Sequence, residues 1–485
     1  MKKYAVLFVI LALVVVGTVF AQTGVPGSGW WSGEQVQNVS STQATVVIEA
    51  FDSKSSNTYV ESKLVNPGAA YTFTPFSDFA GMPAGFLGSA VVSADQPIRA
   101  IVNVTNVPAG GIGAAGGKAA AQYQGTSSDA VATTLYFPLA KGNHYGKTTS
   151  FYIQNAGTSS ATNVVAHFKM RSGNVHTCPV PAIGASKMVV FSIHDCANYT
   201  PAVNNDRVGS MYVTSDQPLA GVVMEHDVVA NPAVVLAGTR AFTSPDFDVK
   251  AYAPVVKNNR FGQWTGIQVQ NVSGGLVDIT VDYTGSAGAC KGFTYQDKAL
   301  GVADGASATF VQQTPQSKLP ANCTGSATIS ATGNVVAIVN ENEVSGSPKT
   351  ATTYSAIADK SKTTSISVPL YKDNRYGATT GLQIQNVGAG NAVNWEVTFR
   401  CSTGGSFTAV SDPAKTGPIA PGAAFNFYTP SGDNLFKAGS SFLNNNVVCS
   451  ASVVSDQPVV AIANEGPLTA GALDNNNYEG FNLAP

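Results

Sequence analysis

Charged side chains are scarce in this chain of 485 residues: they make up 12% of it, and the formal net charge is −2. Binding to a nucleic acid depends on many lysines and arginines acting together, so nothing in this composition indicates a polyanionic partner. The richness in Glu, Lys and Leu that is typical of helical proteins is also missing. Instead, 48 glycines, 25 prolines and abundant Ser, Thr, Asn and Val favour many short strands joined by turns.

The motifs of common catalytic sites are missing too. The chain has no Walker loop, no His-Glu-x-x-His, no Gly-x-Ser-x-Gly and no EF-hand loop. All five histidines lie between His144 and His226, and the acidic residues are scattered singly, without a pair typical of glycosidases. We therefore predict a protein that is not an enzyme and binds no cofactor. An extracellular hydrolase is the weakest of the three functions that we consider.

Only one long apolar run occurs, from Tyr4 to Val16. It follows two lysines and precedes Val19-Phe20-Ala21, a pattern typical of a signal peptide over residues 1–21. Cleavage there leaves 464 residues with a formal charge of −4. The tail carries no sorting motif and no lipidation cysteine. We expect a secreted, extracellular chain that is associated with a bacterial cell surface and has no membrane span once it is processed.

A repeated landmark divides the rest of the chain. Its four copies are Gln37-Asn38-Val39, Gln154-Asn155-Ala156, Gln270-Asn271-Val272 and Gln385-Asn386-Val387, at intervals of 117, 116 and 115 residues. The flanking residues agree as well, since residues 31–40 match residues 264–273 at eight of ten positions. A regular period of this length indicates whole domains that are repeated, rather than turns of a solenoid.

Two further landmarks follow in each repeat. About 30 residues on, a turn glycine precedes an alanine, and we align Gly68-Ala69, Gly184-Ala185, Gly305-Ala306 and Gly422-Ala423. Near the end of each repeat lies a long apolar strand, which is interrupted by Asp95-Gln96-Pro97, Asp216-Gln217-Pro218, Thr332-Gly333-Asn334 and Asp456-Gln457-Pro458. These interruptions predict a turn or a bulge.

Within each repeat the apolar residues alternate. Leu382 and Ile384 point to one side of a predicted strand, while Gln383 and Gln385 point to the other. Such one-sided burial predicts antiparallel sheets, and about 115 residues with seven or eight short strands fit a β-sandwich. The sequence thus predicts an all-β chain of four tandem antiparallel, immunoglobulin-like β-sandwich domains after the signal peptide. Their predicted bounds are 22–128, 129–245, 246–360 and 361–485.

The repeat Gln-Asn-Val…Pro-Gly-Ala…Gly-Ser-Ala…Ser-Asp-Gln-Pro…Ala-Ile-Val-Asn resembles the tandem immunoglobulin-like repeats of bacterial envelope and surface proteins. The resemblance covers the whole processed chain at the level of architecture. It implies a role in adhesion, in a surface layer or in an appendage.

The six cysteines lie two to a repeat, in repeats two, three and four. Pairing within each domain predicts the disulfides Cys178–Cys196, Cys290–Cys323 and Cys401–Cys449, because an exported chain meets oxidising conditions. In repeat two, His176-Thr177-Cys178 and His194-Asp195-Cys196 also offer ligands that suit zinc or copper. A disulfide needs no further assumption, so we predict no metal, although the sequence leaves open whether these histidines bind one.

Tryptophans suggest a possible binding surface. Trp30, Trp31 and Trp264 could stack on sugar rings, and Trp264 occupies the same repeat position as Trp31. Because the position recurs, we favour the simpler interpretation that these rings pack against a neighbouring domain.

Three polar residues occur together in repeats two to four and are missing together from repeat one. The sets are Lys141, Asn143 and Glu225; Lys257, Asn259 and Glu341; and Lys372, Asn374 and Glu465. Repeat one has Gly24, Pro26 and Val104 instead. Because a carboxylate in an apolar strand needs polar partners, we predict that this set ties the opening loop of each module to its last strand. The alternative is three independent surface charges inherited with the repeat.

From these observations we predict a secreted or surface-displayed structural or interaction protein: a surface-layer, sheath, filament or adhesin subunit. Its expected partners are copies of itself or other cell-surface components. The second candidate is an extracellular carbohydrate-binding protein that recognises glycans through aromatic patches.

Overall fold

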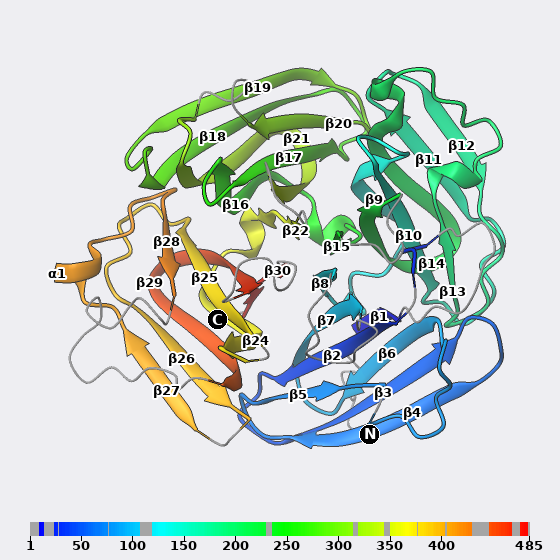
Figure 1. The fold of residues 1–485 in the computed structure, drawn as a ribbon, viewed down its shortest axis with the longest axis horizontal. Helices are drawn as coiled ribbons and strands as arrows, with labels where there is room; N and C mark the ends of the chain where they lie inside the picture. Colours follow the sequence, from blue (N-terminus) through cyan, green and yellow to red (C-terminus); the bar gives the residue numbers. More distant parts are fainter. Residues whose placement is uncertain are drawn as a thin grey trace.

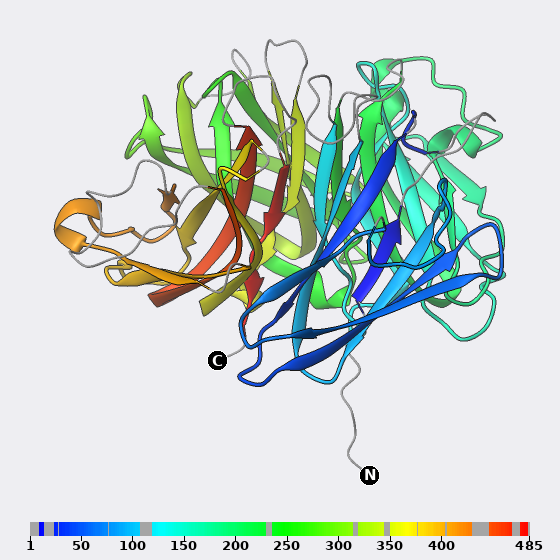
Figure 2. The same cartoon turned by 60° about the horizontal axis from the view of Figure 1, so that its bottom comes forward.

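The computed structural model describes residues 9–13, 24–27, 29–75, 77–106, 119–228, 235–313, 319–343, 350–375, 377–402, 405–428, 446–467 and 476–483. Almost all regular structure in these residues is antiparallel strand, as the composition predicts. Four similar modules follow one another around a ring, in chain order (Figure 1). Figure 2 shows the ring from a tilted direction, with the first module (blue) beside the last one (orange and red). None of the described helices is long and apolar enough to cross a membrane.

The third module shows the plan of all four. A rim sheet has the order β19-β18-β21-β16, and an axial sheet has the order β20-β17-β21-β22 and ends at the centre of the ring (Figure 1). The strands are β16 (Asp248–Asn258), β17 (Gln263–Asn271), β18 (Val277–Gly288), β19 (Thr294–Val302), β20 (Ser307–Gln312), β21 (Cys323–Glu343) and β22 (Ala351–Ser355), followed by β23 (Ile357–Ala358). The long β21 serves both sheets. Its change of sheet falls near Thr332-Gly333-Asn334, where the sequence predicts a turn or a bulge.

The second and fourth modules repeat this arrangement. The second contains β9 (Ala132–Lys141), β10 (Lys147–Asn155), β11 (Val165–Met170), β12 (Val175–Pro179), β13 (Met188–Phe191), β14 (Val208–Asp227) and β15 (Leu236–Arg240). The fourth contains β24 (Thr363–Asp373), β25 (Ala378–Asn386), β26 (Trp395–Cys401), β27 (Ser406–Val410), the short helix α1 (Pro413–Thr416), β28 (Ala424–Phe427), β29 (Val447–Pro467), β30 (Asn476–Glu479) and β31 (Phe481–Asn482). Here β14 and β29 take the place of β21.

The first module differs, because its long strand is divided into two and its first strand comes from far upstream. Its strands are β1 (Val9–Leu13), β2 (Trp30–Asn38), β3 (Ala44–Asp52), β4 (Thr58–Val65), β5 (Ala70–Phe73), β6 (Gly88–Ala94), β7 (Ile98–Asn106) and β8 (Ala120–Gln124). The rim sheet has the order β1-β6-β3-β4, and the axial sheet has the order β5-β2-β7-β8. β1 lies within the predicted signal peptide.

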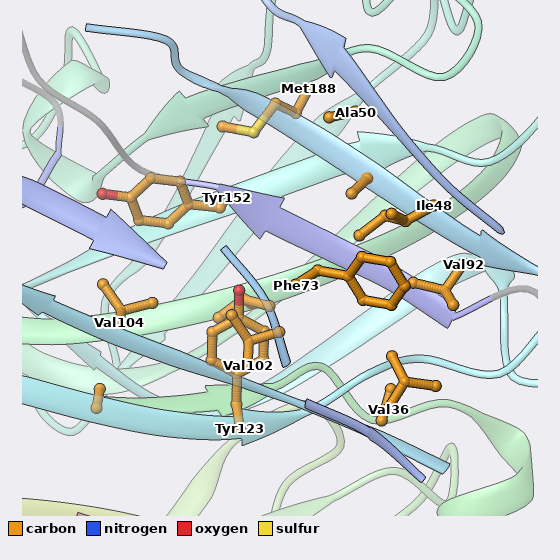
Figure 3. Close-up of a cluster of buried hydrophobic side chains, with 14 of the residues drawn as sticks. Val36, Ile48, Ala50, Phe73, Val92, Val102, Val104, Tyr123, Tyr152 and Met188 are labelled. Atoms are coloured by element: carbon orange, nitrogen blue, oxygen red, sulfur yellow. The ribbon is translucent and has the colours of Figure 1, made fainter. Parts of the chain in front are cut away.

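Each module has its own apolar core, and the cores meet at the module boundaries. In the first module, Val36, Ile48, Phe73 and Val92 are fully buried between the two sheets (Figure 3). Tyr152 and Met188 from the second module belong to the same cluster (Figure 3). Neighbouring modules are therefore packed against each other through shared apolar contacts.

One polar contact recurs at all four boundaries. A buried serine of each module donates its hydroxyl hydrogen to a turn carbonyl of the next module, at 2.6–2.7 Å. The pairs are Ser89 with Ser186, Ser210 with Gly305, Ser326 with Gly422, and Ser450 with Gly68. The last pair joins the fourth module to the first. The ring is therefore closed by the same contact that connects consecutive modules.

The Gln-Asn landmark has a structural explanation in this turn. The glutamine amide in every copy donates to the same turn carbonyl that accepts the neighbour's serine, for example Gln270 to Gly305 at 3.0 Å. The asparagine amide donates to two loop carbonyls, as Asn271 does to Gly275 and Val302. Because buried carbonyls need such partners, both side chains recur in each repeat.

The turn also corrects one alignment made from the sequence. The left-handed position is occupied by Gly68, Gly305 and Gly422 in three modules, but by Ser186 (φ 60°) in the second. Backbone hydrogen bonds to the landmark asparagine confirm that Ser186 is the equivalent residue. Gly184, chosen because glycine is the residue expected at such a turn, lies two positions too early.

Candidate functional site

The three disulfides expected from one cysteine pair per repeat are present: Cys178–Cys196, Cys290–Cys323 and Cys401–Cys449. The first of them uses both cysteines of the His-x-Cys pairs in the second module. Across the described part of the chain, no group of three or more His, Cys, Asp or Glu is arranged to hold a metal ion. His176 and His194 instead pack edge-on against the ring of Tyr199.

The lysines and glutamates of the three polar sets are in contact. The Nζ-to-carboxylate distances are 2.8 Å for Lys141–Glu225, 2.5 Å for Lys257–Glu341 and 2.8 Å for Lys372–Glu465. The three glutamates are only 1–7% exposed. These are therefore buried ion pairs that join the first strand of a module to its last long strand, and not independent surface charges.

A threonine, which the sequence comparison missed, completes each set. In the strand register, the glutamates lie directly opposite Thr149, Thr265 and Thr380. Each threonine hydroxyl accepts a hydrogen bond from the backbone N–H of the lysine in its set. These threonines share one offset from the Gln-Asn landmark, where the first repeat has Ser32. This common offset was the signal that could have revealed them.

The asparagines of the sets have a different role. Asn143, Asn259 and Asn374 have φ values of 60°, 47° and 49°, in the left-handed region that asparagine tolerates better than most residues. They shape the hairpin between the first two strands of their modules. In the first module Val104 is buried opposite Ser32, and it therefore needs no cation.

Each glutamate lies opposite a residue of a central strand: Glu225 opposite β15, Glu341 opposite β22 and Glu465 opposite β30. These three strands and β8 each contact the next at the centre of the ring (Figure 1). Gln122 on β8 donates to Glu465 of the fourth module at 3.3 Å. Asn477 on β30 donates to Glu341 of the third module at 3.5 Å. The polar sets thus link neighbouring modules as well as strands within one module.

The hairpins that begin with these asparagines carry exposed aromatic residues. Tyr145 is 80% exposed and Phe261 is 77% exposed, and both have positive φ angles, 50° and 53°. The guanidinium of Arg260 lies 4.4 Å from the centre of the Phe261 ring. Since the modules are related by rotation about the ring axis, equivalent hairpins lie on the same face of the ring. The fourth hairpin has Tyr376 at this position, which is outside the described residues.

The three tryptophans lie in different environments. Trp30 is 1% exposed within the core of the first module, and its indole N–H donates to the Pro26 carbonyl at 3.0 Å, so it presents no free ring face. Trp31 and Trp264 are half-buried. Of the three, Trp264 lines the cleft between the second and third modules.

This cleft has a volume of about 510 Å³. The second module contributes Lys141, Tyr145, Lys147 and Arg171, and the third module contributes Trp264, Gln268, Asn342 and Glu343. Two hydrogen bonds span its walls, from Lys147 Nζ to Asn342 Oδ1 and from Arg171 Nη2 to Thr309 Oγ1, both at 2.7 Å. An aromatic ring beside amides and cations can stack on a sugar ring and bind its hydroxyls.

The cations control the protonation of the groups around the cleft. Burial alone would raise the pKa of Glu225, but Lys141 and Lys147 hold it at about 2. Burial, together with the positive charges of Lys141 and Arg171, lowers the pKa of His144 to about 4. His144 is therefore uncharged at neutral pH and available only as a neutral hydrogen-bonding ring.

The second module also contains a serine–histidine contact. Ser150 Oγ lies 2.9 Å from His226 Nε2, and the other ring nitrogen lies 2.9 Å from the Asp227 backbone carbonyl. Ser150 is 1% exposed and His226 is 4% exposed. This pair resembles the first two members of a catalytic triad, but both side chains are covered by protein, and the third partner is a carbonyl instead of a carboxylate.

No protein-family model matches the chain, and no curated protein matches it either. Among solved structures, a Thermotoga maritima protein is 11% identical, with 26% of this chain and 95% of that one covered, at a TM-score of 0.19. A DUF4785 family protein from Legionella pneumophila is 8% identical (70% and 80% covered, TM-score 0.11). A serine-rich repeat protein from Streptococcus agalactiae is also 8% identical (80% and 85% covered, TM-score 0.11). At such low TM-scores these likenesses carry no argument about this chain.

Proposed function

We propose that this protein is a secreted structural or interaction protein of a bacterial surface, an adhesin or assembly subunit that binds through the hairpin face of its ring. The observation that carries this proposal is the pair of equivalent, highly exposed aromatic residues Tyr145 and Phe261. A bulky residue with positive φ is strained, and an exposed aromatic ring is poorly hydrated. An asparagine or a glycine would form these turns at lower cost, so the aromatic tips point to contact with a partner.

The hairpin face is tested by replacing both tips with asparagine, which suits the left-handed backbone and should leave the fold intact. We expect Tyr145→Asn combined with Phe261→Asn to lower binding of the processed protein to isolated envelopes of the producing bacterium by more than tenfold, as measured by co-sedimentation. Leu300→Asn is the matched control, because Leu300 is 75% exposed but lies on the rim strand β19. Equal binding by the wild type, the double variant and Leu300→Asn would contradict the proposal.

Carbohydrate binding is the second candidate, and the cleft beside Trp264 is the observation that favours it. We expect Trp264→Ala to weaken binding of the recognised oligosaccharide by more than tenfold, because the stacking face is lost. Trp31→Ala, at the equivalent position of the first module, should leave the affinity unchanged. A glycan array identifies the ligand and calorimetry measures both variants. An equal effect of the two substitutions, or no glycan bound at all, argues against the cleft as a sugar site.

A further inference from the structure

Among the described residues downstream of the predicted cleavage site, the first module has no strand before β2. In the other modules the edge of the rim sheet is covered by β9, β16 or β24. In the first module this edge, on β6, is covered by β1, whose residues 9–13 lie inside the predicted signal peptide. Removal of residues 1–21 would therefore leave the β6 edge uncovered.

The strand register shows that β1 occupies the place of the missing strand. Val9 pairs with Val92, three residues before the Asp-Gln-Pro interruption. At the same position in the other modules, Leu135 pairs with Val213, Ala251 with Ile329, and Ile366 with Val453. The edge of β6 thus accepts an extended strand in the same register as its three equivalents.

The few residues between the predicted cleavage site and β2 are not free to fill this edge. Val25 is 2% exposed, and its N–H donates to the Tyr152 hydroxyl of the second module at 3.0 Å. Pro26 accepts the hydrogen bond from the Trp30 indole at 3.0 Å. Val25 and Pro26 are therefore held by contacts with Tyr152 and Trp30, and neither pairs with β6.

The open edge presents backbone hydrogen-bonding groups. Asp95 N–H donates to the Thr45 carbonyl on β3 at 3.3 Å. Because successive residues of a strand point their N–H groups to opposite sides, those of Ala90 and Val92 point away from β3, toward the edge. The side chains of both residues are fully buried, so a strand at this edge also covers part of the apolar core.

We propose that, in the processed protein, the β6 edge binds an extended strand donated by another polypeptide, with apolar residues at alternate positions facing the core. The equivalent strands define this chemistry, since Leu135 and Phe137 in β9, and Ile366 and Val368 in β24, are completely buried. Backbone pairing to a sheet edge supplies the affinity, and the alternating side chains supply the specificity. The inference rests on the proposed export of the chain, and it adds an interaction surface separate from the hairpin face.

The test uses a labelled peptide with the sequence of β24, residues 363–373, titrated into the chain 22–485 produced under oxidising conditions. We expect a Kd on the order of micromolar by fluorescence anisotropy. Two control peptides should bind more than tenfold more weakly: one with serine in place of Ile366 and Val368, and one N-methylated at these two residues. The second keeps the side chains and replaces the two N–H donors with N-methyl groups, which cannot pair with the edge.

Hydrogen exchange locates the peptide. We expect slower exchange in the fragment covering Gly88–Ala94 when the peptide is bound, and no binding to a chain that retains residues 1–21. Absence of binding by the chain 22–485, or equal binding of all three peptides, would overturn the strand site. This conclusion does not depend on the result of the test of the hairpin face. If the mass of the exported protein shows that residues 1–21 are retained, the edge is filled by the protein's own leader and the proposal is wrong.

Discussion

Replacing Glu34 with leucine is expected to stabilise the first module by roughly 3–5 kcal/mol at pH 9, and by much less at pH 5. Glu34 lies on β2 and is completely buried, where Phe151, Ile267 and Leu382 stand in the other modules. Its carboxylate accepts a hydrogen bond from the Ser32 hydroxyl at 3.2 Å. Burial raises its pKa to about 8.

The direction of the pH effect follows from this pKa. Between about pH 4.5 and 8 the folded state holds a proton that the unfolded state has released, so the free energy of unfolding falls as the pH rises through this window. Glu34→Gln should remove the part of the pH dependence that Glu34 causes but stabilise less than leucine, because a buried amide has more polar atoms than the Ser32 hydroxyl can satisfy. Guanidinium unfolding at pH 5, 7 and 9, followed by tryptophan fluorescence, measures both effects. A stability difference between the wild type and Glu34→Gln that is the same at all three pH values would contradict a buried acid at this position.

Removing the lysine of a polar set is expected to destabilise the third module strongly. Lys257→Met leaves Glu341, which is 1% exposed, without its cation, and the expected cost is about 3–5 kcal/mol. Lys141→Met in the second module is the matched control. Lys147 remains 3.3 Å from Glu225 there, so the cost should be clearly smaller.

The glutamate itself is expected to be replaceable once its lysine is gone. The first module has Val104 at this position without any cation, so Glu341→Val combined with Lys257→Met should recover most of the stability lost by Lys257→Met alone. A double-mutant cycle measured by guanidinium unfolding gives the coupling between the two residues. Additive effects would show that the 2.5 Å contact contributes nothing to stability.

Much of the local structure could be predicted from the sequence, because it is encoded in short repeated patterns. The alternation in residues such as Leu382 and Ile384 indicates strands, and the joint presence of lysine and glutamate in three repeats indicates a shared contact. Ser186 shows where such reasoning fails. The left-handed turn there carries no glycine, so the nearest glycine was chosen in its place.

The closed ring could not be predicted, because it depends on contacts between residues that carry no distinctive signal. Ser450 is one serine among many, and its bond to the Gly68 carbonyl joins residues 382 positions apart. Glu34 was overlooked for a similar reason. It lies among polar residues in the sequence, and only the strand register shows that it points into the core.

The serine-to-carbonyl boundary is a heterologous interface, in which each module presents one surface to its predecessor and a different one to its successor. An interface of this kind either closes into a ring or continues without limit as a fibre. Here the fourth module meets the first, so neither of the two complementary surfaces is left unoccupied. Copies of the chain therefore cannot polymerise through this boundary unless a ring first opens, and an assembly of intact rings must use other surfaces.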